Sequence, residues 1–157
     1  MNKSAKETTM NKETITMKEY RECKEKVNDF ERSVIVAAIV TGKLVNASIS
    51  DVTAVVPDSN GGIWLHVGGN AHHMSGKELR SMMKGGGRWV VDFKGVWSDK
   101  EYRIFDDKKS ANRYYDECMA RTAECAEEGD DYDIEWVDIN WYDWADFPEE
   151  ALDYADL

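Results

Sequence analysis

The first strong hydrophobic pattern in the chain begins at Met17. Apolar side chains recur there at the three-to-four residue spacing of one helical face, through Tyr20 and Phe30, while lysines and glutamates fill the positions between them. This pattern predicts an amphipathic helix from Met17 to about Arg32. Residues 1–16 before it are polar and rich in Lys, Glu and Thr, which predicts a flexible N-terminal arm.

The next stretch, Ser33–Val40, is continuously apolar and rich in β-branched residues. Such a run suits a buried strand, and a continuation of the helix is the alternative, because periodicity does not separate the two in a short run. A turn is predicted at residues 41–43. Two further strands are predicted over Leu44–Ile49 and Val52–Val56.

Turn-forming residues then divide the middle of the chain into a hairpin and a short helix. Residues 57–62, Pro-Asp-Ser-Asn-Gly-Gly, lead directly into the apolar strand Ile63–Val67, which predicts a β-hairpin. Ser75, with Glu78 three residues later, is typical of a capped helix N-terminus. We therefore expect a helix over residues 76–84, ended by three glycines.

Two strands and a longer helix follow the glycines. The strands are predicted over Arg88–Phe93 and Glu101–Phe105. Asp106 or Asp107 is expected to cap a helix that runs from Lys108 to about Glu127.

Acidic and apolar residues alternate from Asp131 to Trp136, which is the period of a half-buried strand. Tyr132, Ile134 and Trp136 are expected to face the core. The alternation reverses at Val137, where we expect a bulge, and a short helix is predicted after Pro148. The whole order predicts an α+β fold with a mainly antiparallel sheet, an N-terminal helix, a short middle helix and a longer helix before an acidic C-terminal strand.

The composition adds limits on size and location. With 157 residues, 42% of them hydrophobic, the chain can bury one core, so we expect a single domain over residues 17–157. Its apolar runs are shorter than a membrane span, and no apolar secretion segment stands near the N-terminus. Cys23, Cys118 and Cys125 are too few for a disulfide framework. We expect a cytoplasmic protein with reduced thiols and no membrane partner.

Negative charge is concentrated in the C-terminal segment, residues 122–157. This segment holds fourteen of the 31 acidic residues and no lysine or arginine, whereas the first 121 residues carry the other 17 against 20 basic residues, a formal charge of +3. Seven aromatic residues are interspersed with these acids. Because a merely solubilising tail has no need of aromatic residues, we expect an ordered acidic surface.

On a strand over residues 131–136, alternate carboxylates lie on one face about 6.7 Å apart. Successive phosphates along one DNA strand are separated by roughly 7 Å. Together with exposed Trp and Tyr anchors, such a face is predicted to occupy a basic, nucleic-acid-binding site on another protein. The predicted binding residues are Asp130, Asp131, Asp133, Glu135, Asp138, Trp141, Tyr142, Asp143, Trp144, Asp146, Glu149 and Glu150. The alternative is an edge strand that its charges protect from aggregation.

In composition this segment resembles the acidic DNA-mimicking inhibitors that phages and mobile elements use against restriction and CRISPR systems. The likeness covers about the last quarter of the chain. It implies a protein that binds a basic partner and does not itself bind nucleic acid. The sequence contains no serine elbow motif and no cysteine nucleophile motif, so we expect no enzyme activity, no cofactor and no metal.

Two other functions stay open. Lys77–Arg113 holds ten basic against six acidic residues, and would make a nucleic-acid-binding module that the acidic end restrains. His66, His72 and His73 form the second candidate, the site of a small metal-dependent enzyme. No cysteine pair or second carboxylate completes a zinc-type set around these histidines.

Overall fold

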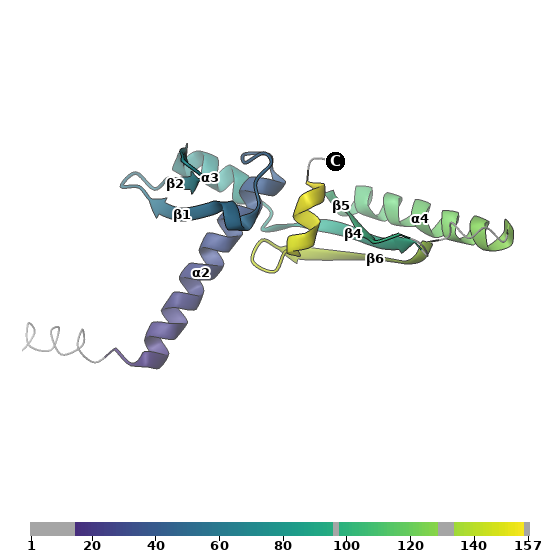
Figure 1. Cartoon of the computed structure of the whole chain (residues 1–157), viewed down its shortest axis with the longest axis horizontal. Coiled ribbons are helices and arrows are strands. Elements are labelled where there is room, and N and C mark those ends of the chain that lie inside the picture. The colour runs from purple at the N-terminus through teal and green to yellow at the C-terminus, as the bar shows by residue number, and fades with distance from the viewer. Residues whose placement is uncertain (1–14, 96–97, 129–133, 156–157) are drawn as a thin grey trace, which may run out of the picture.

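A computed structural model describes residues 15–95, 98–128 and 134–155. The fold is α+β, with two antiparallel sheets and helices before, between and after their strands (Figure 1). The elements in chain order are α2 (Met17–Val40), the 3-10 helix η1 (Ile49–Asp51), β1 (Val52–Pro57), β2 (Ile63–Val67), β3 (Asn70–Met74), α3 (Gly76–Met83), β4 (Gly87–Gly95), β5 (Lys100–Phe105), α4 (Lys108–Glu128), β6 (Ile134–Asp143) and the 3-10 helix η2 (Glu149–Tyr154). The arm predicted over residues 1–16 lies almost entirely outside the described residues.

The strands of the described residues form two separate three-stranded sheets. The N-terminal sheet has the order β1-β2-β3, and the C-terminal sheet has the order β5-β4-β6, so β4 is central and β6 is an edge strand. β3 was not predicted, because its Asn-Ala-His-His-Met sequence lacks the β-branched pattern of a strand. None of the described helices is long and apolar enough to cross a membrane.

α2 continues to Val40, so the strand predicted over Ser33–Val40 is wrong and the alternative of a longer helix is correct. Every residue from Val34 to Ile39 is buried. A helix that is covered on all sides is apolar on all sides, and it therefore loses the periodicity that identifies a surface helix. Thr16 begins α2 with a capping box that includes Glu19.

The strand predicted over Leu44–Ile49 is also wrong. After the turn at residues 41–43, Leu44 is buried in the core and its N–H donates to the carbonyl of Ala38 at 3.0 Å. Asn46 has a φ of 55°, a left-handed conformation that no continuous strand accommodates. η1 then leads into β1, close to the predicted strand Val52–Val56.

The local signals around the middle of the chain are confirmed. The β1–β2 hairpin closes over residues 57–62, and the Ser75 hydroxyl accepts from the Glu78 N–H at the start of α3. Gly85 and Gly86, with φ of 88° and 73°, end that helix in conformations open to glycine. The strands β4 and β5 and the helix α4 lie close to their predicted bounds.

Asp107, rather than Asp106, caps α4 by accepting from the N–H of Ser110 at 2.7 Å. The N–H and the hydroxyl of Ser110 both donate to this carboxylate, and these hydrogen bonds lower the pKa of Asp107.

β6 contains its bulge at Glu135 and not at the predicted Val137. Ile134 pairs with Gly95 and Trp136 pairs with Lys94, which leaves Glu135 as the extra residue. The extra residue places Ile134 and Trp136 on opposite faces of the sheet. Ile134 is buried as predicted, whereas the prediction that Trp136 faces the core is wrong, since its side chain is 37% exposed. Tyr132 lies outside the described residues.

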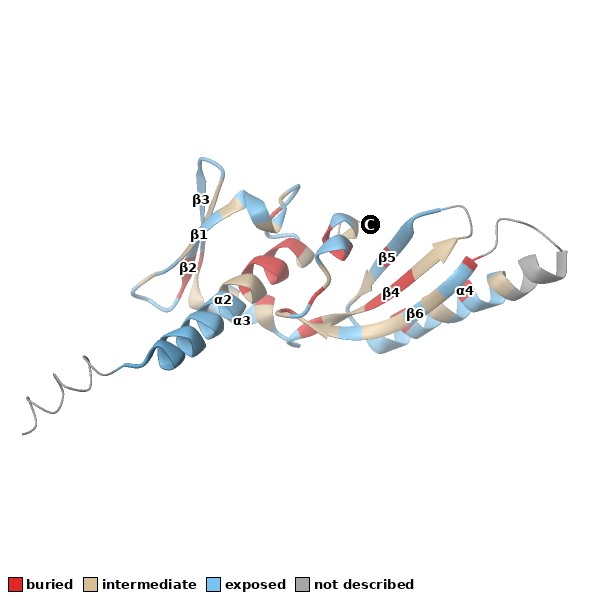
Figure 2. Ribbon diagram, turned by 60° about the horizontal axis from the view of Figure 1, so that its bottom comes forward, coloured by how far each residue is buried: buried red, intermediate tan, exposed pale blue. Residues whose placement is uncertain are grey.

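One core joins both halves of the chain. The buried half of α2 packs with Leu65 of β2, Val90 of β4, and Trp144 and Phe147 after β6. Figure 2 shows the second half of α2 buried, while the first half extends outward and is exposed. The C-terminal segment is therefore part of the folded body.

The two faces of the C-terminal sheet have different covers. α4 lies on one face, where Tyr114 contacts Phe93 and Phe105 with ring centroids 6.1 and 5.5 Å apart. η2 lies on the other face, where the rings of Tyr154 and Tyr102 are 5.7 Å apart.

Arg32 of α2 holds the C-terminal segment in place. Its Nη1 donates to the carbonyls of Trp144 at 3.3 Å and Ala145 at 2.7 Å, and its Nη2 donates to the carbonyl of Phe147 at 2.8 Å. Three carbonyls that follow the end of β6 thus share one guanidinium. Only arginine has the forked donors for this arrangement.

We predict that Arg32→Met lowers the free energy of unfolding by about 3 kcal/mol, because three carbonyls lose a charged donor in a half-buried position. Arg32→Lys should recover only part of this loss. Urea denaturation of the purified variants measures the effect. Arg21→Met, on the exposed first half of the same helix, is the control and should leave stability unchanged, and equal losses in both variants would contradict the role of Arg32.

Candidate functional site

The predicted binding residues lie along β6 and η2 and in the loop between them. Glu135, Asp138, Trp141, Tyr142 and Asp143 belong to β6, Trp144 and Asp146 follow it, and Glu149 and Glu150 begin η2. Asp130, Asp131 and Asp133 lie outside the described residues. β6 is an edge strand and η2 is anchored by Ala151 and Leu152, both buried, so both elements present carboxylates from a fixed backbone.

The described carboxylates of β6 do not continue a regular ladder. Glu135 occupies the bulge and forms an ion pair with Lys94 at 2.7 Å. Asp138 accepts from the N–H of Ile139 and from the side-chain amide of Asn140. The spacing expected to match phosphates depends on Asp131 and Asp133, so the match stays a prediction.

The aromatic residues of the segment divide into exposed and core positions. Trp141 is 44% exposed at the edge of the C-terminal sheet, while Tyr142 is half-buried against Phe147. Trp144 is 2% exposed, and its indole N–H donates to the carbonyl of Met83 at 3.3 Å. The prediction that Trp144 contributes to the binding surface is therefore wrong, because its side chain is needed to complete the core.

η2 presents a group of exposed acids beside the segment that leads into β1. Glu149, Glu150 and Asp153 are exposed, and across from them lie Ser48 and Asp51. Two adjoining hollows of about 340 and 300 Å³ separate the two sides. We call these hollows together the acidic groove.

Asp51 is fixed in its ionised form at one wall of the acidic groove. Its Oδ2 accepts from the backbone N–H of Ser48 at 2.8 Å and from the Ser48 hydroxyl at 3.0 Å. These hydrogen bonds lower the pKa of Asp51, because they favour the carboxylate. Asp51 was not among the predicted binding residues, and the signal that would have identified it is the Ser-Ile-Ser-Asp cap spacing at residues 48–51.

Few of the C-terminal acids whose side chains the structure describes are neutralised within the molecule. These acids are seven: Glu135, Asp138, Asp143, Asp146, Glu149, Glu150 and Asp153. Among the residues that the structure describes, only Glu135 lies within ion-pair distance of a lysine or arginine. In the described part of the chain the other six carboxylates have no lysine or arginine within ion-pair distance, so they are available to a cationic partner.

Half of the ten basic residues of Lys77–Arg113 are engaged inside the molecule by ion pairs or by contacts with aromatic rings. Arg88 pairs with Asp106 at 3.0 Å, and Lys100 pairs with Asp92 at 3.2 Å. Lys108 and Arg103 lie over aromatic rings. The hollow along the exposed face of α4 mixes three basic with two acidic side chains: Lys108, Lys109, Arg113, Asp116 and Glu117.

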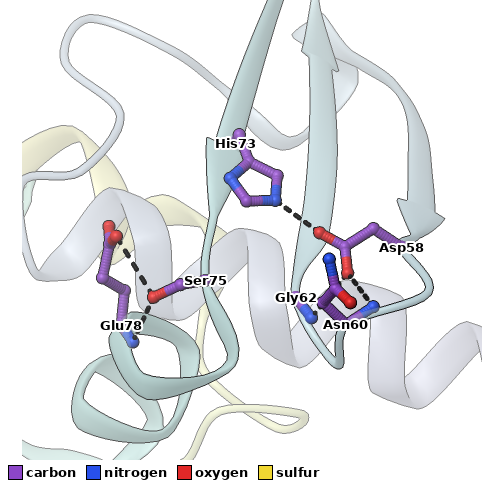
Figure 3. A network of polar contacts seen from close by, with 6 residues as sticks. All are labelled: Asp58, Asn60, Gly62, His73, Ser75 and Glu78. Atoms are coloured by element: carbon purple, nitrogen blue, oxygen red, sulfur yellow. Dashed lines mark hydrogen bonds and ion pairs between the residues drawn. The ribbon is translucent and has the colours of Figure 1, made fainter.

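The three histidines of the N-terminal sheet do not converge. His72 pairs with Leu65, and His73 pairs with Trp64, so neighbouring histidines point to opposite faces. His73 bonds through Nε2 to the carboxylate of Asp58 (Figure 3), and its ring packs on Trp64 with centroids 4.6 Å apart. No three potential metal ligands gather within the described ranges.

Asp58 uses both carboxylate oxygens to brace the β1–β2 hairpin. The bond from His73 is the main cause that lowers the pKa of Asp58, and the N–H of Asn60 adds to the effect. Its Oδ1 also accepts from the N–H of Gly62 at 3.0 Å. Among the three histidines, His73 thus has a structural role at this hairpin.

Asp92 on β4 is a buried charge on the face of the C-terminal sheet where η2 lies. Its side chain is in a residue only 5% exposed, and its Oδ1 has no hydrogen-bond partner among the described residues. The Lys100 ammonium that pairs with its Oδ2 also lies 5.2 Å from the ring centroids of Tyr102 and Trp136. Burial lowers the pKa of Lys100, but the hydrogen bonds with Asp92 and Tyr102 outweigh burial and raise it. Lys100 therefore stays charged and holds Trp136 in position.

Comparisons of the chain with protein-family models, with curated proteins and with solved structures find no significant match.

We predict that Lys100→Met destabilises the fold by about 2 kcal/mol, because it leaves the buried Asp92 carboxylate without a counter-charge. Adding Asp92→Val to that variant should recover most of the loss, since the buried charge that Lys100 neutralised is then gone as well. Thermal and urea unfolding of the two variants measure the difference. A double variant that is less stable than Lys100→Met would contradict this account of the pair.

Proposed function

We propose that this protein is an acidic binding module that occupies a basic, nucleic-acid-binding site on a partner protein. The observation that supports the proposal is the set of six C-terminal carboxylates that are fixed in the fold and have no counter-charge among the described residues. The acidic groove is the centre of the proposed site. In this proposal the protein acts as a nucleic-acid mimic of the anti-defence type, without enzyme activity.

The acidic groove has the chemistry to receive arginine or lysine side chains. Glu149, Glu150 and Asp153 stand on one side, and Asp51 stands on the other. Hydrogen bonds from Ser48 lower the pKa of Asp51 and so favour its ionised form. A guanidinium binds carboxylates with two parallel hydrogen bonds, so an arginine-lined nucleic-acid site is a suitable partner.

Like charges held this close repel one another and reduce stability. A basic partner would relieve that repulsion on binding. Long-range attraction would also accelerate association, and salt would slow it, because ions screen exposed charges within about 10 Å at 0.1 M ionic strength. The exposed Trp141 on β6 would add an apolar anchor beside the charges.

The proposal predicts that the triple variant Glu149→Lys/Glu150→Lys/Asp153→Lys loses the partner. The three side chains are exposed, so the fold should survive the change. The matched control is Glu22→Lys/Glu25→Lys/Asp29→Lys on the polar side of α2. It makes the same change in net charge at a site that does not line the acidic groove. Truncation is not a useful test, because Phe147 and Leu152 belong to the core.

The measurement is capture from nuclease-treated cell extract on immobilised wild-type protein and on both variants, followed by competition with duplex DNA. We expect wild type and control to retain the same proteins, DNA to displace them, and the acidic-groove variant to retain none of them. Equal capture by all three proteins, or captured proteins that DNA does not displace, would contradict mimicry.

A direct DNA-binding assay on the same proteins tests the alternative that Lys77–Arg113 binds nucleic acid under restraint by the acidic end. That alternative predicts that the acidic-groove variant binds DNA more tightly than the control variant. Mimicry predicts no such difference.

A further inference from the structure

The first half of α2 extends away from the rest of the molecule (Figures 1 and 2). From Met17 to Phe30 its side chains are exposed on every side, in contrast to the buried second half. Tyr20 and Val27 are each 54% exposed and Phe30 is 50% exposed, although all three are large and apolar. A projecting helix with an uncovered apolar stripe is a candidate interface.

The apolar residues of this stripe follow the spacing of a coiled coil. Tyr20, Cys23, Val27 and Phe30 are separated by three, four and three residues, and the next position in the series is the buried Val34. They therefore take the a and d positions of two heptads. We call them the α2 seam. The outward positions of these heptads are all polar: Arg21, Glu22, Glu25, Asn28 and Asp29.

The charges beside the α2 seam are complementary to those of a second, parallel copy. Glu19 and Lys26 occupy the g positions, and Lys24 and Glu31 occupy the e positions. In a parallel pair each g residue faces the e residue five positions later on the other helix. Glu19 then meets Lys24, and Lys26 meets Glu31, in both directions, so all four pairs are attractive.

The reverse orientation is less favourable. In the antiparallel register that overlaps the whole seam, Lys24 would face Lys24 of the second copy, and Lys26 would face Lys26 of the second copy. Like charges in such positions destabilise the pair. The charge pattern thus distinguishes between the two orientations.

The seam ends at an apolar groove of the same molecule. Val27 and Phe30 form one wall of this groove, and Val55, Pro57 and Ile63 of the N-terminal sheet form the other. Its volume of about 330 Å³ leaves room for an aromatic side chain from a neighbouring helix. A partner helix would therefore meet apolar surface up to the point where α2 enters the core.

We propose that two copies of this chain associate through the α2 seam as a short parallel helix pair. Tyr20, Cys23, Val27 and Phe30 pack against their counterparts, and the flanking ion pairs set the orientation. The acidic groove takes no part in the contact. The dimer would carry two acidic surfaces, and its existence does not depend on what those surfaces bind.

Charge reversal tests both the contact and its direction. Lys26→Glu should weaken dimerisation about tenfold, because two attractive pairs become repulsive. Adding Glu31→Lys should restore the wild-type dissociation constant, since the reversed charges again face each other. Adding Glu19→Lys instead should weaken it further. Sedimentation equilibrium over a range of concentrations measures association, and circular dichroism checks that each helix is intact.

Oxidation provides an independent readout. The two Cys23 thiols would meet at one d layer of the parallel pair, so mild oxidation should give a disulfide-linked dimer. Cys23→Ser should abolish the cross-link, while Cys118→Ser should not, because Cys118 is buried. A wild-type chain that is monomeric at every concentration, or rescue by Glu19→Lys in place of Glu31→Lys, would overturn the proposal.

Discussion

Burial of the apolar second half of α2 is the interaction on which the rest of the structure depends. Six consecutive residues, Val34–Ile39, are covered on all sides by parts of both sheets and by the chain that follows β6. This burial is a large favourable term, since each of the four valine and isoleucine side chains contributes about 1.5–3 kcal/mol when it is fully buried. The same helix then directs the C-terminal segment, because Arg32 binds three of its carbonyls.

This arrangement explains how the molecule tolerates a dense negative surface. The C-terminal residues alternate between roles: Trp144, Phe147, Ala151 and Leu152 pack inward, while the carboxylates between them face water. Because the carboxylates stay hydrated, they avoid the free-energy cost of desolvation. Burial of the inward side chains offsets the repulsion between the carboxylates. The charge is thus carried on a short scaffold of buried aromatic and aliphatic residues. Outside the C-terminal segment, Asp92 of β4 is a buried carboxylate, and it forms an ion pair with Lys100.

Local chemistry could be predicted from the sequence, whereas features set by tertiary packing could not. Ser75, Asp107 and the turn at residues 57–62 act on their immediate neighbours, and the structure places them as expected. Ser33–Val40 could not be assigned, because complete burial removes helical periodicity. The orientation of Trp136 was predicted wrongly because the bulge at Glu135 depends on how β6 pairs with β4, a strand that is far away in the sequence. The acidic groove needs Asp51, which only the fold brings beside η2.

The topology of the C-terminal sheet has a consequence for synthesis. β4 leaves the ribosome with β5, but its other neighbour arrives only after the whole of α4, since Gly87 pairs with Asp143. Phe147 and Leu152 emerge later still, so the cover of the apolar half of α2 stays incomplete until they have been synthesised. Because these core residues and the exposed carboxylates belong to the same segment, completion of the core and formation of the acidic surface occur together.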